Sequence, residues 1–275
     1  MGLPRYKQPN QFRSFTYPQI KESDFKENQV SLPKIGWVKF KKSREFPTGL
    51  IPKQLRVVKK AVGAFIQIIF VSQEDVPDIM PGKTSLGIDA GISSLIATSD
   101  GELIKTLLFV QKERSSLKSL QRKLKHKTKG SSNWLKLQKI IAKLHFVVSS
   151  RRTDWLFKLA HQLCDRANNI FIKNLDFRGW QKGLFGKQIN NSAIGKFINQ
   201  ILPFVCFKRG VYYLKVDKNY TSQICPKCGT NTGKKSLNQR VHRCNCGAVL
   251  NRDLAAAKII QQRGKTAVGH TAVNK

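Results

Sequence analysis

The stretch Leu86-Gly-Ile-Asp-Ala-Gly-Ile-Ser-Ser-Leu-Ile-Ala-Thr98 decides the fold of this chain. Its short apolar runs, broken by glycine and serine, predict a buried strand, a turn and a second strand. Ser99-Asp-Gly101 predicts a hairpin turn, and a third strand is expected over residues 102–110. Asp89 lies inside the first strand, where a carboxylate is costly unless it binds a cation or is well hydrogen-bonded.

The pattern on the C-terminal side of this stretch alternates helices and strands. Helices are expected over residues 111–145, 149–168 and 192–209, and strands over 169–175 and 211–216. Asn251-Arg-Asp-Leu-Ala-Ala-Ala257 opens a last helix, whose alanines allow close packing against a sheet. Three strands followed by helices, strand, helix, strand and helix form the succession of an α/β, RNase H-like domain.

On the N-terminal side, residues 1 to about 50 are rich in basic and aromatic residues, with no helical period. Arg13–Pro18 and Trp37–Phe40 alternate as strands do, and Leu55–Val71 indicates a strand or hairpin. We therefore expect this segment to form part of a small β-barrel.

A basic helical hairpin is expected over residues 111–148, with the loop Lys127–Ser132 between its two halves. Leucines and isoleucines at helical spacing form one apolar seam, and the outer face is cationic, with Glu113 as its acid. A solvated charged face is the plain alternative, but contact with phosphates explains the imbalance better. The candidate nucleic-acid-binding residues are Arg114, Lys118, Arg122, Lys125, Lys136, Lys139, Lys143, Arg151 and Arg152.

Four cysteines lie in two close pairs, Cys225-Pro-Lys-Cys228 and Cys244-Asn-Cys246, and each pair is followed by glycine. Two such turns aim four thiolates at one tetrahedral ion, so Cys225, Cys228, Cys244 and Cys246 predict a structural Zn²⁺ ribbon. Cys164 and Cys206 stand in apolar helical surroundings and are expected in the core.

The net charge indicates which kinds of partner the chain can bind. Its 275 residues carry 50 Lys+Arg against 16 Asp+Glu, a formal net charge of +34. Such an excess favours a polyanion, and nucleic acid is the leading candidate because each neutralised phosphate releases counterions. The longest apolar run, Ala64–Val71, is far too short to span a membrane, and no signal peptide is visible, so we expect a cytoplasmic protein without a membrane partner.

Asp89 and Asp253 can act as a pair. Asp253 opens the alanine-rich helix and Asp89 lies in the first strand, so both carboxylates can reach one point. Two converging carboxylates are what Mg²⁺ ions need to hold a phosphodiester and activate water. Each motif is weak alone, and their combination with the cysteine pairs is specific.

With these residues the chain resembles the TnpB (OrfB) proteins of bacterial insertion sequences, which are relatives of compact type V CRISPR effectors. The resemblance covers nearly the whole chain. The matching motifs are Pro4-Arg-Tyr6, Ser14-Phe-Thr-Tyr-Pro18, Leu86-Gly-Ile-Asp-Ala-Gly91, Asp176-Phe-Arg-Gly179, Lys208-Arg-Gly-Val211, Val216-Asp217, Thr221-Ser-Gln-Ile-Cys225, Thr232-Gly-Lys234 and Asn251-Arg-Asp-Leu-Ala-Ala-Ala257.

The resemblance implies a RuvC-like nuclease core, a zinc ribbon and a barrel that holds guide RNA. Intact members are RNA-guided DNA endonucleases linked to transposition, so DNA and guide RNA are the implied partners. The catalytic, Mg²⁺-binding aspartates correspond to Asp89 and Asp253, and the zinc ligands to the four paired cysteines. The implied ranges are 1–84 for the barrel segment, 85–217 for the RuvC-like domain with the hairpin 111–148, 218–250 for the ribbon, 251–265 for the final helix and 266–275 for the tail.

Two departures from the family pattern shape the functional prediction. The family's middle catalytic glutamate is replaced in Lys173-Asn-Leu175, and a protonated lysine cannot ligate Mg²⁺. Asp176 is the nearest acid, but at an odd separation in a strand it faces the other side. We expect a catalytically weak or dead centre.

The second departure is that Asp89 comes early, which predicts a barrel that lacks strands and an impaired hold on guide RNA. A degenerate nuclease and a repurposed, non-cleaving RNA-guided DNA-binding protein both fit these departures. A ribosomal or RNA-chaperone ribbon protein explains the charge but not the two aspartates.

Overall fold

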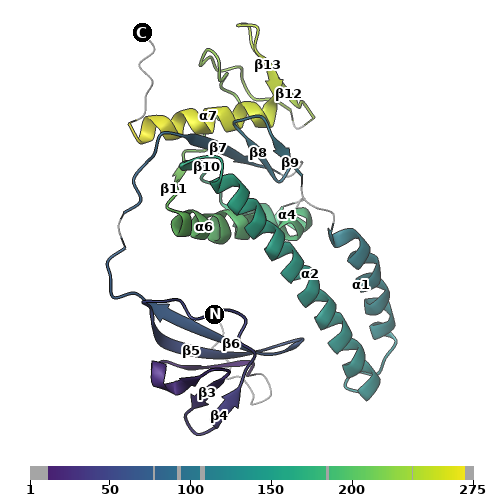
Figure 1. The fold of residues 1–275 in the computed structure, drawn as a ribbon. Helices are drawn as coiled ribbons and strands as arrows, with labels where there is room; N and C mark the ends of the chain where they lie inside the picture. Colours follow the sequence, from purple (N-terminus) through teal and green to yellow (C-terminus); the bar gives the residue numbers. More distant parts are fainter. Residues whose placement is uncertain are drawn as a thin grey trace, which may run out of the picture. The chain divides into compact units, whose positions relative to one another are not determined.

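The computed structural model describes residues 12–76, 78–91, 94–105, 109–183, 186–236 and 238–269 (Figure 1). The chain divides into two compact units, which we treat separately. The first unit comprises Met1–Pro77 and Gln121–Phe146, and the second comprises Asp78–Leu120 and Val147–Lys275. The helical hairpin thus contributes residues to both units, whereas the sequence analysis placed 111–148 within the second alone.

The first unit contains two three-stranded antiparallel sheets. One has the order β1-β5-β6, and the other has the order β2-β3-β4. The bounds are Ser14–Tyr17 (β1), Phe25–Lys26 (β2), Gln29–Leu32 (β3), Gly36–Lys39 (β4), Ile51–Lys60 (β5) and Gly63–Val71 (β6), with a 3₁₀ turn at Glu22–Asp24.

The strands expected near residues 13–18, 37–40 and 55–71 are confirmed, and the described strands do not close a barrel, of which the sequence predicted only a part. Among the described strands, β1 and β6 are the two edges of their sheet, so the sheet stays open. The apolar side chains pack between the sheets instead, around Val30, Leu32 and Leu55, all of them buried. The burial that a closed barrel would provide is therefore reached by stacking two small sheets.

Two helices form the hairpin, α1 (Phe109–Lys125) and α2 (Ser132–Cys164). The sequence predicted a break between residues 145 and 149, and this is wrong, because the 33-residue helix α2 continues across these positions. The sequence from Ser132 to Cys164 contains neither glycine nor proline, so nothing there ends the helix. Within the described residues, no helix combines the length and apolarity that crossing a bilayer needs.

A five-stranded mixed sheet organises the second unit, in the order β11-β10-β7-β8-β9. Strands β7, β10 and β11 are parallel, and β8 and β9 continue the sheet antiparallel. The bounds are Ser85–Ala90 (β7), Ile96–Thr98 (β8), Leu103–Ile104 (β9), Asn169–Lys173 (β10) and Tyr212–Val216 (β11). The third strand was predicted to reach residue 110, which is wrong, because α1 already begins at Phe109.

Helices cover both faces of this sheet (Figure 1). On one face, Leu86, Ile88 and Ile172 pack against α2 and against the helical segment over residues 194–209. This segment corresponds to the helix predicted over residues 192–209. That segment consists of α5 (Ile194–Lys196), a π turn (Phe197–Ile201) and α6 (Leu202–Arg209), and it follows the short helices α3 (Phe177–Lys182) and α4 (Gly186–Ser192). Cys164 and Cys206 are buried in this core, as predicted, and their sulfur atoms lie 3.6 Å apart.

The opposite face of the sheet carries α7 (Arg252–Ala267), which lies along β7 and β10 at very short range (Figure 1). A Cβ atom placed on Gly87 would stand 2.2 Å from the Ala257 carbonyl oxygen and 2.6 Å from the Gln261 nitrogen. On the helix side, a Cβ on Gly264 would stand 2.1 Å from the Phe171 ring. The alanines at 255–257 are fully buried, so the predicted close packing of this helix is confirmed.

A two-stranded ribbon of β12 (Val241–Arg243) and β13 (Val249–Asn251) precedes α7 directly. Two contacts tie the segment that carries the ribbon to the helix. The Arg252 amide donates to the Arg240 carbonyl at 2.8 Å, and Gln262 Nε2 donates to the Pro226 carbonyl at 2.8 Å. The ribbon and the last helix are therefore one continuous structural element of the second unit.

Gly87→Ala should destabilise the second unit by at least about 3 kcal/mol, since the new methyl group meets helix backbone rather than a movable side chain. Chemical denaturation monitored by circular dichroism measures this. Gly179→Ala in α3 is the control, because its Cβ has open space and alanine favours a helix. Equal stability of the two variants would contradict the close helix–sheet contact.

Candidate functional site

Asp89 lies near the end of β7, on the face that α7 covers. Side chains alternate along a strand, so Asp89 shares the side of Gly87, whereas Ile88 points into the opposite core. Its side chain is 11% exposed. The Asp89 carboxylate therefore lies at the carboxyl end of the parallel strands, where ligands bind in α/β sheets.

Lys173 is the direct neighbour of Asp89 on the adjacent strand. Ile172 of β10 pairs with Ile88 of β7, so the next residue along each strand comes beside the other. Lys173 Nζ lies 2.7 Å from Asp89 Oδ1, and its side chain is 13% exposed. The position predicted to have lost a glutamate therefore holds an ammonium that forms an ion pair with Asp89.

Asp253 reaches the same region from the first turn of α7. The Asn251 side chain caps this helix by accepting hydrogen bonds from the Asp253 and Leu254 amides, at 2.9 and 3.4 Å. Arg252 Nε lies 3.8 Å from Asp253 Oδ1, and Arg252 Nη1 donates to the Ser236 carbonyl at 2.9 Å. Arg252 was not singled out in the sequence, although its place directly before Asp253 was the available signal.

Electrostatics link these groups. Burial raises the pKa of the Asp89 carboxyl, and this outweighs the opposing effect of the Lys173 ammonium. Asp253 raises that pKa further, and Arg252 lowers it. Asp89, Lys173, Asp253 and Arg252 are thus close enough to act on one another, as the sequence predicted for the two aspartates.

The donor set does not fit a pair of Mg²⁺ ions. Magnesium needs oxygen ligands at about 2.1 Å in octahedral geometry, and here an ammonium already occupies one oxygen of Asp89. Asp176 offers no evident replacement, since β10 ends at Lys173 and the side chain of Asp176 is exposed. The carboxylates of Asp89 and Asp253 are balanced by the cations of Lys173 and Arg252. The cluster is therefore neutral, whereas a magnesium site needs a surplus of negative charge.

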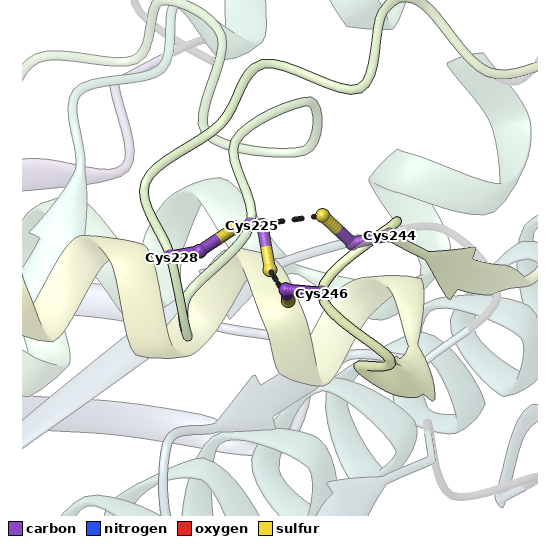
Figure 2. A group of neighbouring side chains, drawn as sticks. All are labelled: Cys225, Cys228, Cys244 and Cys246. Atoms are coloured by element: carbon purple, nitrogen blue, oxygen red, sulfur yellow. Dashed lines mark hydrogen bonds between the residues drawn. The ribbon is translucent and has the colours of Figure 1, made fainter.

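The four paired cysteines converge at the ribbon (Figure 2). Their sulfur atoms all lie within 4.8 Å of one another, with 3.7 Å between Cys225 and Cys246 and 3.5 Å between Cys228 and Cys244. Tetrahedral zinc with Zn–S bonds of about 2.3 Å requires sulfurs about 3.8 Å apart. The predicted ligand set is therefore brought together, and its chemistry fits a closed structural zinc site.

Neighbouring groups favour the thiolate at Cys228. Hydrogen bonding with Thr230, whose Oγ1 lies 3.3 Å from the Cys228 sulfur, lowers the pKa of the Cys228 thiol to about 6. Lys235 donates to Thr232 Oγ1 at 2.7 Å and brings a positive charge near Cys225 and Cys244. His242, two residues before Cys244 in the sequence, is buried and is not part of the group of four sulfurs.

A basic and aromatic groove of about 960 Å³ lies within the first unit. Strand β1, the β5–β6 turn and α2 form its walls, and its described lining contains no acid. Lys60 Nζ stands 4.8 Å above the ring of Phe65, next to the groove. The groove is lined by Phe12, Arg13, Ser14, Phe15, Val57, Lys59, Lys60, Ala61, Val62, Gly63, Ala64, Lys139 and Lys143.

The candidate nucleic-acid contacts fall into different environments. Arg151 forms an ion pair with Glu113 at 2.7 Å, and Arg152 is half-buried, with Nη1 3.4 Å from the Asn190 carbonyl. The side chain of Arg114 lies outside the described residues. The remaining candidates are exposed, namely Lys118, Arg122, Lys125, Lys136, Lys139 and Lys143.

Comparison with known protein families gives two matches. Residues 68–182 match the OrfB_IS605 family, described as "Probable transposase". Residues 196–260 match the family described as "Cas12f1-like, TNB domain", a range that includes the cysteine cluster and Asp253.

Similar sequences include two bacterial proteins. The chain is 30% identical over 279 residues to "Putative RNA-guided DNA endonuclease InsQ" of Escherichia coli (strain K12), covering 96% of this chain and 69% of the relative. It is 31% identical over 273 residues to "Putative RNA-guided DNA endonuclease" of Streptomyces pristinaespiralis, covering 96% and 66%. The chain thus spans about two thirds of the length of these relatives.

A solved structure shares the fold. The chain matches the "Cryo-EM structure of the Cas12f1-sgRNA-target DNA complex" with a TM-score of 0.51 and 20% sequence identity. The match covers 77% of this chain and 46% of that chain. At this identity the match supports the arrangement of the elements only.

The cysteine cluster predicts about one zinc ion per purified chain, held by four thiolates. Cys228→Ser should lower the zinc content severalfold, and Cys164→Ala, which changes a core thiol outside the cluster, should leave it unchanged. Mass spectrometry of metals after dialysis gives the count. A full zinc content in Cys228→Ser would contradict the four-sulfur assignment.

Proposed function

The chain belongs to the TnpB (OrfB) family, and from this premise we propose that it is a transposon-encoded nucleic-acid-binding protein with a deficient cleavage centre. The family activity is RNA-guided DNA cleavage linked to transposition, and DNA and guide RNA are the proposed partners. The ion pair between Lys173 and Asp89 is the observation that carries the deficiency.

The fold supports a RuvC-like, RNase H-like core in the second unit. The sheet order β11-β10-β7-β8-β9 keeps the three-stranded antiparallel part on one side of β7 and the parallel strands on the other. Asp89 on β7 and Asp253 on α7 are the proposed aspartates of such a core, and the electrostatic effect of Asp253 on Asp89 supports this. The cysteine cluster before α7 supports the zinc ribbon of the same proposal.

The charge distribution supports binding of a polyanion. The chain has a net charge of +34, and its basic groove combines five cationic side chains with exposed phenylalanines. The cationic side chains attract phosphates, and unpaired bases stack on the phenylalanine rings. Both RNA and displaced DNA strands offer this combination of groups.

The cleavage deficiency follows from the charge at Lys173. In a two-metal centre, acids hold both cations while a water attacks the phosphodiester. Here the ammonium neutralises Asp89, and the middle acid is absent. The basic groove and the cysteine cluster could still hold nucleic acid, but the centre lacks the acidic side chains that metal-assisted hydrolysis needs.

A second function fits the same observations. A repurposed protein that binds target DNA under RNA guidance without cutting it would keep the ribbon, the basic groove and the intact core, and would lose only the middle acid. Retention of folded, buried packing around the altered centre favours this reading over random decay.

Cleavage by the unaltered chain should be at least about 100-fold slower than by Lys173→Glu in Mg²⁺, since the substitution restores a third acid beside Asp89. The chain is purified with the RNA that it retains, that RNA is sequenced, and DNA matching it serves as the target. Single-turnover rates are measured on gels.

The paired outcomes separate the two functions. Efficient cutting by the unaltered chain would refute the deficiency, and a Lys173→Glu variant that binds target yet stays inactive would show that Lys173 is not its sole cause. Asp89→Asn combined with Lys173→Glu is the control, because it should cancel any restored cleavage.

Nucleic-acid affinity should depend on the basic groove. Lys139→Glu combined with Lys143→Glu should weaken binding of a labelled 20-nucleotide RNA at least about tenfold and reduce the salt slope by about 2. Fluorescence anisotropy at several salt concentrations measures both quantities.

Lys158→Glu combined with Lys208→Glu makes the same change of charge at exposed lysines outside the groove and should have a smaller effect. Equal losses in the two double variants would show that net charge, and not the groove, governs binding.

A further inference from the structure

We propose that Lys173 is the resident cation of the Asp89 centre, so that the second unit holds this carboxylate without a divalent ion. The proposal concerns stability and metal response. Only its consequence for nucleic-acid binding rests on the proposed function.

The contact geometry supports a permanent pairing. The Nζ–Oδ1 distance is 2.7 Å, and the two side chains are only 13% and 11% exposed, so water competes weakly for either group. A carboxylate in such surroundings needs a compensating cation. The ammonium supplies that charge from within the chain.

The backbone of Lys173 keeps the ammonium in place. Strand β10 lies between β7 and β11, and Lys173 pairs in register with Val216 of β11. The next amide, that of Asn174, donates to the Val216 carbonyl at 2.9 Å. The backbone of Lys173 is thus held on an inner strand, and only a change of its side-chain rotamer would separate the ammonium from Asp89.

The charge balance of the cluster leads to the same conclusion. Asp89 and Asp253 contribute two negative charges, and Lys173 and Arg252 contribute two positive charges. The first turn of α7 adds the positive end of a helix dipole beside Asp253. A neutral cluster attracts Mg²⁺ far less than three acids would, and Mg²⁺ gives up its water reluctantly.

The test is thermal unfolding of the full chain, with its zinc retained, in buffer freed of divalent ions by a chelating resin. MgCl₂ is added up to 20 mM against NaCl of equal ionic strength. The Tm of the unaltered chain should stay within about 1 °C. Lys173→Glu should have a lower Tm without Mg²⁺ and gain several degrees with it, because three carboxylates then need a cation.

Further variants make the result independent of how well Lys173→Glu folds. Lys173→Met should lower the Tm by on the order of 10 °C, since it leaves Asp89 buried without a partner. Asp89→Asn combined with Lys173→Met removes both charges and should recover most of that loss. Lys118→Glu, on the exposed face of α1, controls for the change of net charge and should show no response to Mg²⁺.

Two outcomes would overturn the proposal. One is a rise in the Tm of the unaltered chain with Mg²⁺ that equals the rise seen in Lys173→Glu. The other is a double variant no more stable than Lys173→Met, which would mean that the ammonium does not compensate Asp89.

Nucleic-acid binding gives a separate readout. The unaltered chain should bind a labelled 20-nucleotide single-stranded DNA with the same Kd with and without Mg²⁺ at equal ionic strength. A threefold or greater tightening by Mg²⁺ would count against a metal-independent centre. Absence of binding under all conditions would refute the proposed function and leave the Tm results to decide this inference.

Discussion

The close approach of α7 to the central sheet is the constraint on which the second unit depends. Gly87 on the strand and Gly264 on the helix leave no room for even one methyl group, and buried alanines fill the rest of the contact. At this range the helix start falls beside the end of β7, which brings Asp253 towards Asp89. A bulkier interface would lift the helix and separate the two carboxylates, so the chemistry of the centre is set by small side chains that carry no chemistry themselves.

A buried carboxylate at that place creates an electrostatic requirement that any variant of this fold must meet. Metal ions meet it when acids surround the position, and here an ammonium on the neighbouring strand meets it. Under the proposed function, lysine in place of a glutamate at position 173 would remove a metal ligand and supply the cation in one step. The ion pair is consistent with the packed face of the sheet under α7, where Phe171, Val216 and Ile260 are buried.

Local patterns in the sequence were sufficient for much of this. The cysteine pairs, the strand around Asp89 and the capped helix after Asn251 each depend on neighbouring residues, and each lies where it was expected. The errors concern where elements end. The third strand ends before residue 110 because α1 already begins at Phe109, and α2 continues because no glycine or proline between Ser132 and Cys164 ends it. The role of Arg252 follows from its contacts with Ser236 and Asp253, and its place directly before Asp253 was the one sign of it in the sequence.

The cysteine cluster and the aspartate centre are mechanically coupled, although their chemistry is independent. The second cysteine pair is followed at once by β13 and then by α7, and the Arg252 amide is bonded to the Arg240 carbonyl before β12. Farther along the helix, Gln262 holds the Pro226 carbonyl inside the first cysteine turn. A metal at the four sulfurs would therefore fix both the beginning and the middle of α7. Because Asp253 lies in the first turn of that helix, zinc bound at the four sulfurs would help to position this aspartate without touching it. A chain that has lost metal-assisted cleavage would still need its zinc to keep the nucleic-acid-binding surface of the second unit in shape.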